Sequence, residues 1–253
     1  MPTPLEFMQQ YRNIRVTAVI DDPVRRMCRE ETFTVQLRKY FMMDWTAGSE
    51  ENNDFTAVTS GGRRNDWYQT NREAILNAAM GKGRPQDYGL ALEWAIRSRK
   101  IPIPTQTTIQ TYFDEHMGID CSGFATNYLV AAGIKTYSAE TLRNTGAASY
   151  FNVAKAINDS FSVRRGDLLV WMKGNAVKRD PGHIAVVESY VGQCIVGGNM
   201  RVVESTGASG AEPKLLDSMY DVEDIIPKNG AVPMILVVKR HGVSGHRVVV
   251  IRP

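Results

Sequence analysis

The chain has 253 residues, 43% of them hydrophobic and 23% charged, a composition typical of a folded globular protein and not of a disordered segment. Its 30 Lys and Arg residues nearly balance its 27 Asp and Glu residues, and the basic residues form at most adjacent pairs, which argues against a nucleic-acid-binding stripe. Three widely spaced cysteines do not make a disulfide framework, and the four histidines show no zinc-ligand spacing.

The start of the chain lacks the basic segment and the long apolar segment of a secretory signal. No stretch reaches the roughly 18 apolar residues that a membrane-spanning helix needs. We therefore expect no membrane span and a protein that is cytoplasmic as synthesised. Export by a route without a cleaved signal stays open.

The first 105 residues are predicted to be mainly helical. Apolar residues recur at broadly helical spacing over 24–45, with Cys28 on the buried face, although the run Thr-Phe-Thr-Val at 32–35 also suits a strand. A polar loop is expected at 46–65, followed by helices at 70–80 and 86–99. The run Ile-Pro-Ile-Pro at 101–104 then breaks the pattern. We place a domain boundary there, between an N-terminal extension of unknown role at 1–105 and a second domain at 106–253.

The second domain is predicted to have an α+β fold. A helix is expected over 121–132, with Gly133 ending it. Runs rich in β-branched residues then predict strands at 167–172, 183–190, 194–196, 201–204, 233–239 and 246–251. Gly and Asn separate these runs at short intervals, which is typical of antiparallel strands, and Cys194 is expected in their core. One helix followed by antiparallel strands indicates an α+β order.

Cys121 is the first candidate for chemistry. It stands at the start of the predicted helix, between Asp120 and Ser122. The positive end of the helix dipole and the unpaired N–H groups of the first turn favour a thiolate over a thiol, so we expect a lowered pKa and a nucleophilic sulfur. The alternative is an inert cysteine buried in the core, which is common for this residue type.

His183 and Glu204 are the candidates for a base and for the group that orients it. His183 follows a Pro-Gly turn and opens a β-forming run, a position suited to a base that must hydrogen-bond a thiol. Glu204 is a carboxylate in an apolar run, and we expect it to accept a hydrogen bond from Nδ1–H of the imidazole. Glu188 is disfavoured because its odd offset from His183 puts it on the opposite strand face, provided that no bulge intervenes. Ser205 stays open as a weaker alternative.

These residues carry a resemblance to a known family. The motif Asp120-Cys121-Ser122-Gly123-Phe124 resembles the nucleophile motif of the NlpC/P60 cysteine peptidases. The runs 165–171 (Arg-Gly-Asp-Leu-Leu-Val-Trp) and 182–188 (Gly-His-Ile-Ala-Val-Val-Glu) resemble the strand pair that follows it in that family, and the histidine run is also similar to the CHAP amidases. The resemblance covers roughly residues 112–206, under half of the chain.

The resemblance implies a papain-like fold, in which the helix bearing the nucleophile packs on an antiparallel sheet. It implies hydrolysis of amide bonds in peptidoglycan stem peptides or cross-links, without a metal or an organic cofactor. Cys121 then corresponds to the nucleophile, His183 to the base and Glu204 to the third polar position. The residues implied at the substrate are Tyr112, Asp120, Ser122 and Gly182.

The sequence departs from the family after Tyr112, where Phe113-Asp114-Glu115-His116 replaces a usual Gly-Gly pair. Two alternatives to a wall hydrolase stay open. One is a deamidase or acyltransferase that acts on an amide outside peptidoglycan with the same residues, because fold and triad do not determine the substrate. The other is a binding module with an idle triad. A peptidoglycan-derived peptide is the expected partner, nucleic acid is not expected, and an inhibitor or immunity protein stays open.

Overall fold

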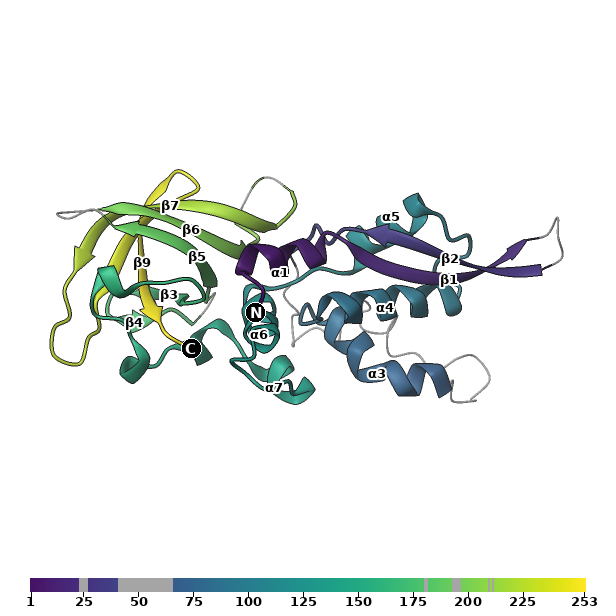
Figure 1. Ribbon diagram of the computed structural model, residues 1–253, viewed down its shortest axis with the longest axis horizontal. Helices are drawn as coiled ribbons and strands as arrows, with labels where there is room; N and C mark the ends of the chain where they lie inside the picture. The colour runs from purple at the N-terminus through teal and green to yellow at the C-terminus, as the bar shows by residue number, and fades with distance from the viewer. Residues whose placement is uncertain (23–26, 41–65, 180–181, 193–196, 209, 211) are drawn as a thin grey trace. The chain divides into compact units, whose positions relative to one another are not determined.

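The computed structural model describes residues 1–22, 27–40, 66–179, 182–192, 197–208, 210 and 212–253 (Figure 1). They form two compact units: a barrel unit of residues 1–8 and 121–253, and a helical unit of residues 9–120. The predicted boundary near residue 105 falls inside the helical unit. The chain instead passes from one unit to the other between Asp120 and Cys121, and its first eight residues belong with the barrel.

The helical unit combines helices with one hairpin. Its elements, after the end of α1 (Pro4–Tyr11), are β1 (Ile14–Asp22), β2 (Met27–Val35), α3 (Asp66–Ala79), α4 (Pro85–Arg97) and α5 (Gln106–His116). The helices predicted at 70–80 and 86–99 correspond to α3 and α4 and are confirmed. The predicted loop at 46–65 lies outside the described residues. Thr105 accepts a hydrogen bond from the Thr108 N–H and so caps α5, a helix that the sequence pattern did not indicate.

The helix predicted over 24–45 is wrong, and the strand alternative at 32–35 is confirmed, because the described part contains the strand β2. The strand pairs antiparallel with β1, from Ile14 opposite Val35 to Asp22 opposite Met27. In β1 the side chains of Ile14, Val16 and Ala18 are buried at every second position, as a strand with one covered face requires. Cys28 is exposed on β2, so the prediction of a buried helical position for it is also wrong.

The barrel unit contains a six-stranded antiparallel β-barrel in the part of the chain that the structure describes. The strand order is β3-β5-β6-β7-β8-β9, and pairing of β9 with β3 closes it, while the short β4 extends β3. The strands are β3 (Leu168–Lys173), β4 (Ala176–Val177), β5 (Ile184–Gly192), β6 (Gly198–Ser205), β7 (Leu215–Ile226), β8 (Ile235–Arg240) and β9 (Val243–Ile251). The α+β class is therefore confirmed.

Five predicted strands correspond to β3, β5, β6, β8 and β9. The predicted strand 194–196, with Cys194, lies outside the described residues. The strand β7 was not predicted. Its sequence alternates buried Tyr220 and Val222 with exposed Asp221 and Glu223, but its several acidic residues lower its β propensity.

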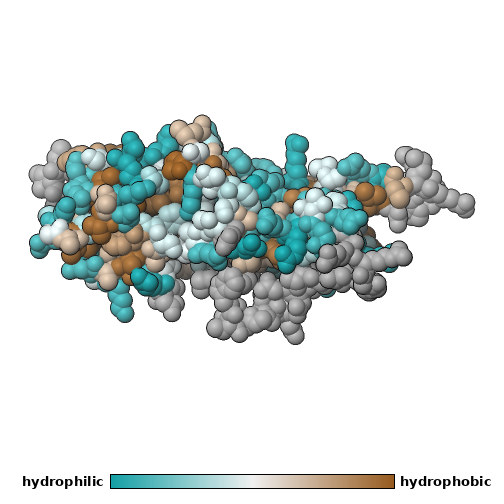
Figure 2. Space-filling view, turned by 90° about the horizontal axis from the view of Figure 1, so that it is seen from below, coloured by the Kyte–Doolittle hydropathy of each residue, from teal (hydrophilic) through white to brown (hydrophobic). Residues whose placement is uncertain are grey.

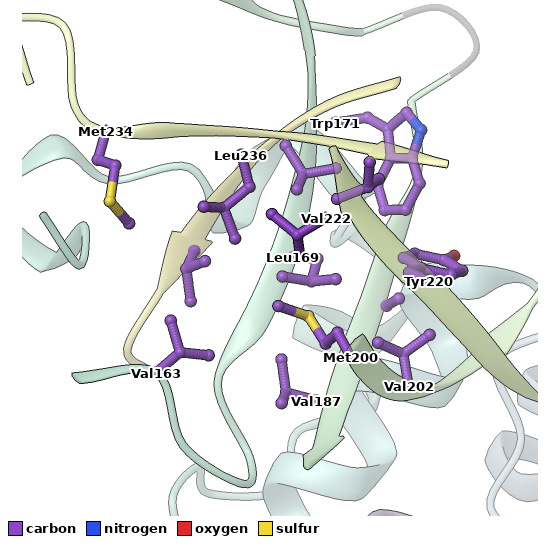
Figure 3. Packing of buried hydrophobic residues seen from close by; sticks show 14 residues of the cluster. Val163, Leu169, Trp171, Val187, Met200, Val202, Tyr220, Val222, Met234 and Leu236 are labelled. Atoms are coloured by element: carbon purple, nitrogen blue, oxygen red, sulfur yellow. The ribbon is translucent and has the colours of Figure 1, made fainter. Parts of the chain in front are cut away.

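The core of the barrel is made by alternate residues of all six strands (Figure 3). Leu169 and Trp171 come from β3, Ala185 and Val187 from β5, and Met200 and Val202 from β6. Because strand residues two apart share a face, His183 and Glu204 continue the inward-facing rows of β5 and β6. Two polar side chains are thus aimed into one end of an otherwise apolar interior.

Short helices cover the outside of the barrel. The helix α6 (Cys121–Ala131) packs against β5, β6 and α7 (Ala139–Asn144), and Gly133 ends it with a φ of 69°. The predicted helix over 121–132 is confirmed. At the chain start, the ring of Phe7 on α1 lies 5.7 Å from Phe124 and 6.1 Å from Tyr128, both on α6. Three short 3₁₀ turns, η1 (Ala147–Tyr150), η2 (Val153–Lys155) and η3 (Ser160–Ser162), connect α7 to β3.

The surface mixes residue types. In Figure 2, brown hydrophobic residues of the barrel unit are interspersed among teal and white ones. Exposed large apolar side chains occur singly along the chain, among them Val19, Phe161 and Met219. Among the described residues, no helix is both long and apolar enough to cross a membrane.

Candidate functional site

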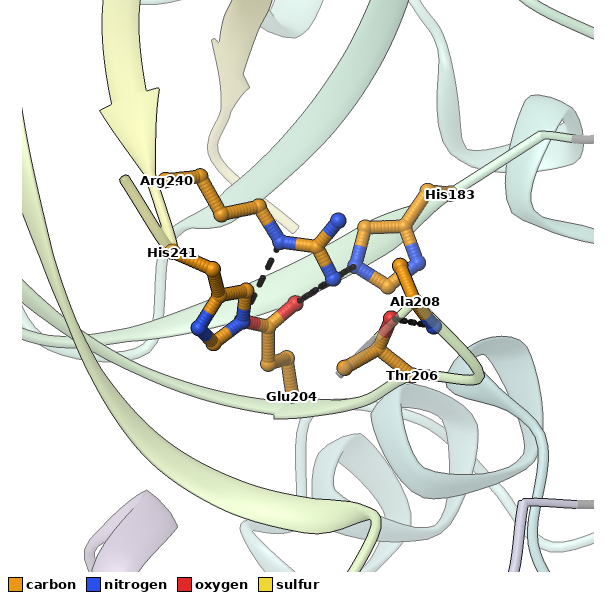
Figure 4. Close-up of polar contacts among 6 residues, drawn as sticks. All are labelled: His183, Glu204, Thr206, Ala208, Arg240 and His241. Carbon is orange, nitrogen blue, oxygen red and sulfur yellow. Dashed lines mark hydrogen bonds and ion pairs between the residues drawn. The ribbon is translucent and has the colours of Figure 1, made fainter. Parts of the chain in front are cut away.

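His183 and Glu204 meet at one end of the barrel interior. His183 directly precedes β5, and Glu204 is the last residue but one of β6. The imidazole Nε2 lies 2.7 Å from Oε2 of Glu204. The side chain of Glu204 is fully buried and that of His183 is 12% exposed. The contact uses Nε2 and not the expected Nδ1, and Figure 4 shows Nδ1 on the side of the ring away from Glu204.

Arg240 and His241 complete the hydrogen bonding of Glu204 (Figure 4). Arg240 donates from Nη2 to Oε2 at 2.6 Å and from Nε to Oε1 at 3.3 Å. His241 Nε2 lies 3.0 Å from Oε1. A buried carboxylate must be paired to remain charged, and here one arginine and two histidines surround it.

The pKa values in this cluster shift for identifiable reasons. Burial alone would raise the pKa of Glu204, but the hydrogen bonds of His183 and His241 and the positive charge of Arg240 hold it well below its usual value. Burial lowers the pKa of His183, and the positive charge of Arg240 adds to that shift, while the contact with Glu204 opposes it. Near neutral pH the cluster thus contains a carboxylate and a neutral imidazole.

This protonation pattern determines which imidazole nitrogen can act as a base. Nε2 lies 2.7 Å from a carboxylate oxygen and 3.3 Å from Nη2 of Arg240, itself a donor. Only Nε2–H satisfies the carboxylate, so the lone pair of a neutral His183 is at Nδ1. The cluster holds one tautomer, with Nδ1 ready to accept a proton.

Aromatic rings fix the plane of the imidazole. The ring of Trp171 packs edge-on against His183 at 4.5 Å, and its backbone N–H donates to the His183 carbonyl at 3.1 Å. The guanidinium of Arg240 lies 5.4 Å from the same indole ring, within cation–π range. Tyr220, fully buried, packs edge-on to Trp171 at 6.0 Å, and its pKa is raised by burial.

Cys121 is the first residue of α6 and is 5% exposed. Its position in the first turn is the one predicted, and the first turn of the helix carries no acidic side chain. Ser122, which follows it, is 3% exposed, and its carbonyl accepts a hydrogen bond from Thr126 Oγ1 at 2.6 Å. The helix that begins at Cys121 packs against β5, which His183 directly precedes, and against β6, which contains Glu204.

Two of the predicted substrate residues lie in the helical unit. Asp120 is 8% exposed and forms an ion pair with Lys82, with 2.6 Å between Nζ and Oδ2. Tyr112, on α5, is also 8% exposed, and its ring centroid lies 4.2 Å from that of His116. His116 is the last residue of α5, and its ring is tilted by 36° relative to that of Tyr112.

Gly182 precedes His183 and has a steric reason to be glycine. A Cβ atom there would lie 3.0 Å from the carbonyl oxygen of Lys178 and 3.2 Å from that of Arg179. These distances are tighter than ordinary van der Waals contacts, and both neighbours are backbone atoms. A side chain at this position would push the chain away and displace the adjacent histidine.

The rival carboxylate Glu188 has different partners. A bulge interrupts the β5–β6 register between Val187 and Ser189, so Glu188 itself lies in the irregularity. Its carboxylate pairs with Arg165 at 3.0 Å and accepts the Leu5 N–H, in the first turn of α1, at 3.1 Å. Glu188 therefore holds the chain start to the barrel. Ser205, fully buried, is on the opposite strand face from Glu204.

Sequence reasoning missed Trp171, Arg240 and His241. The sequence did contain a signal for Arg240, because it follows the buried Leu236 and Val238 at every second position, which places it on the same face of the strand. Basic residues at the end of a strand, however, usually face solvent. Among the described residues, no group of three or more His, Cys, Asp or Glu side chains is arranged to hold a metal ion. No protein-family model, no curated protein and no solved structure matches this chain.

Proposed function

We propose that the chain is a papain-like cysteine hydrolase of the NlpC/P60 type that cleaves amide bonds in peptidoglycan stem peptides or cross-links. Cys121 is the nucleophile, His183 the base and Glu204 the orienting carboxylate. The observation that supports the proposal most is the buried His183–Glu204 contact at 2.7 Å. Two residues that lie far apart in the sequence, and that were selected for these roles from the sequence alone, share a hydrogen bond in an otherwise apolar barrel end.

The fold is consistent with this chemistry. A helix that begins at the cysteine packs on an antiparallel sheet, in which Glu204 lies on β6 and His183 directly precedes β5, similar to the arrangement of the papain-like family. Cys121 is the first residue of α6, at the positive end of the helix dipole, and its N–H is proposed to bind the oxyanion. No cofactor is required for the steps below.

The proposed reaction is acyl transfer through a thioester. Nδ1 of His183 takes the thiol proton of Cys121, and the thiolate attacks the substrate carbonyl carbon, whose oxygen becomes an oxyanion. The tetrahedral intermediate collapses, the C–N bond breaks, and His183 returns its proton to the leaving amine. Water then attacks the thioester with His183 as base, and the acid leaves as the thiol is restored.

Glu204 contributes by holding the imidazole. Its negative charge favours the imidazolium that forms when His183 accepts a proton, and its bond to Nε2 keeps Nδ1 directed to the reaction. Arg240 keeps the carboxylate ionised, because removing that cation would leave a buried anion with fewer partners. Tyr112, Asp120, Ser122 and Gly182 are proposed to lie beside the substrate.

The test is cleavage of purified muropeptides by the chain and its variants, followed by mass spectrometry. We expect product pairs whose masses sum to that of the substrate plus one water. Cys121→Ala should lower the rate by about 10³-fold or more, whereas Cys28→Ser, which removes the exposed cysteine, should retain it. Full activity of Cys121→Ala would contradict the assignment of the nucleophile. Release of ammonia without cleavage of a peptide bond would identify the reaction as deamidation of a primary amide.

A further inference from the structure

The residue before the nucleophile is held by the turn between α3 and α4. The Asp120 carboxylate lies 2.6 Å from Nζ of Lys82, and its backbone N–H donates to the carbonyl of Gly81 at 3.0 Å. Lys82 is 7% exposed and Asp120 is 8% exposed, so this ion pair is buried. Two consecutive residues of the helical unit therefore hold both the side chain and the backbone of Asp120.

The turn that presents Lys82 has a specified shape. Gly81 has a φ of 70°, a conformation that favours glycine, and the Lys82 N–H donates to the Asn77 carbonyl at 2.8 Å. A Cβ atom on Gly83 would lie only 2.8 Å from the Cα of Ala78. Glycine is thus required on both sides of Lys82, and the shape of the turn fixes the position of the Lys82 backbone.

The two residues before Asp120 are held by the same unit. The carbonyl of Gly118 accepts a hydrogen bond from the Tyr88 hydroxyl at 2.6 Å. The Ile119 N–H donates to the Lys39 carbonyl at 3.1 Å. Each residue of the run 118–120 therefore has a partner in the helical unit, up to the peptide bond that leads into α6.

We propose that the Lys82–Asp120 pair is a positioning device that sets the ionisation of the Cys121 thiol. This inference rests on the proposed function, in which Cys121 is the nucleophile. Asp120 and Cys121 are joined by one peptide bond, so their Cα atoms lie about 3.8 Å apart. A negative charge on the residue next to a thiol disfavours the thiolate, and the ammonium of Lys82, 2.6 Å from the Asp120 carboxylate, offsets that charge.

The inference also gives the N-terminal region a role in the reaction. Residues 9–120 supply the cation and the turn that hold the chain immediately before the nucleophile. Through Lys82 they contribute to the electrostatics of the reacting cysteine, in addition to the roles proposed for Tyr112 and Asp120 beside the substrate. An ion pair with a purely structural role would not shift the ionisation of Cys121 in opposite directions, because losing either partner would destabilise the fold in the same way.

The charge balance can be tested by removing each charge separately. Lys82→Met removes the cation beside the carboxylate and should raise the pH midpoint of Cys121 alkylation by about one unit. Asp120→Asn leaves the ammonium and should lower the midpoint by a similar amount. The double variant Lys82→Met/Asp120→Asn should return the midpoint close to that of the parent chain, since both charges are gone.

The measurement is the rate of iodoacetamide alkylation as a function of pH, with peptide mapping so that each cysteine is followed separately. Lys228→Met, which removes an exposed lysine between β7 and β8, is the matched control and should leave the midpoint unchanged. His183 and Glu204 are intact in every variant, so differences report the Lys82–Asp120 pair.

Opposite shifts in the two single variants support the inference. Shifts of the same sign, or none in either folded single variant, would overturn it. If Lys82→Met does not fold, the downward shift of Asp120→Asn and its reversal in the double variant decide the outcome. The proposed function is tested separately, by muropeptide cleavage with Cys121→Ala, because alkylation reports thiol ionisation whether or not an amide is cleaved.

Discussion

At the scale of single residues, Glu204 decides the electrostatics of the barrel end. A lone carboxylate with no exposed surface would be protonated, because charge is costly in a low-dielectric interior. Arg240, His183 and His241 reverse this by donating hydrogen bonds to both carboxylate oxygens. The same arginine lies near the imidazole and disfavours its protonation, so one cation serves two groups with opposite charge requirements.

The first prediction concerns this double effect of Arg240. Replacing Arg240 with Met removes a positive charge near His183 and leaves the negative charge of Glu204 less balanced. Both changes favour the imidazolium, so the pKa of His183 should rise from its lowered value. It is measured by NMR titration of labelled histidines in a Cys121→Ala background, in which no thiol titrates with the imidazole.

Lys178→Met is the control for this titration. Lys178 also lowers the pKa of His183 through its charge, but among the described residues it makes no hydrogen bond to Glu204. Its removal should raise the pKa by less than the removal of Arg240 does. An unchanged or lower pKa in a folded Arg240→Met variant would show that burial alone controls the imidazole.

The contact between His183 and Glu204 could be foreseen from the sequence, whereas its surroundings could not. Strand alternation places Glu204 on the inward face together with Val202, and that reasoning needs only a local pattern. The partners of the carboxylate come from β8 and from the turn after it, across the barrel. Because such contacts depend on how distant strands close, no local pattern indicates them. The catalytic roles of these residues stay predictions.

At the scale of elements, local patterns predicted the strands that are rich in β-branched residues and failed where charge obscured them. β7 is the longest strand described, yet exposed Asp217, Asp221 and Glu223 interrupt its apolar residues. The segment that contains β2 has apolar residues that also match helical spacing, and pairing with β1 overrides that pattern. Propensity is a weak signal that tertiary pairing readily reverses.

The second prediction concerns the turn that leads into β3. Gly166 has a φ of 86°, and a Cβ atom there would lie 3.1 Å from the hydroxyl of Tyr128 on α6. Gly166→Ala should therefore lower the free energy of unfolding by about 2–3 kcal/mol, from about 1–2 kcal/mol of left-handed backbone strain and a displaced tyrosine. Urea unfolding measures the loss.

Gly174→Ala is the matched control for this loss. Gly174 has a φ of 63°, but a Cβ atom there would meet nothing within 4 Å. Its replacement should cost only the backbone strain, about 1–2 kcal/mol. Equal losses in the two variants would mean that Tyr128 yields freely and that the approach of α6 to this turn is not tightly packed.

At the scale of the whole molecule, closure of the barrel brings the two ends of the strand region together. β9, the last strand, pairs with β3, the first, from Leu168 opposite Ile251 to Met172 opposite Arg247. The sequence predicted an antiparallel set of strands and gave no sign of this closure, because pairing over such a separation leaves no local trace. The grouping of the first eight residues with the barrel was likewise invisible, since it depends on Glu188 and on packing against α6.

The third prediction tests an ion pair that fastens the closed barrel. Asp167, just before β3, is 1% exposed and accepts hydrogen bonds from Nε and Nη2 of Arg252, just after β9, both at 3.1 Å. Arg252→Met would leave that carboxylate without its cation. Breaking a fully buried pair costs about 3–5 kcal/mol, and because Arg252 is 32% exposed we expect about 2–3 kcal/mol.

An exposed pair of the same geometry provides the comparison. Arg201 donates from Nε and Nη2 to the two carboxylate oxygens of Asp217, at 2.8 and 2.6 Å, but both side chains are open to solvent. Arg201→Met should leave the urea midpoint unchanged, because water screens the charges and hydrates each partner alone. The loss in Arg252→Met should persist at high salt, since buried charges are little screened. Equal losses of stability in the two variants would contradict the prediction. They would mean that the burial of Asp167 does not increase the contribution of Arg252, and that closure of the barrel depends on β3–β9 pairing alone.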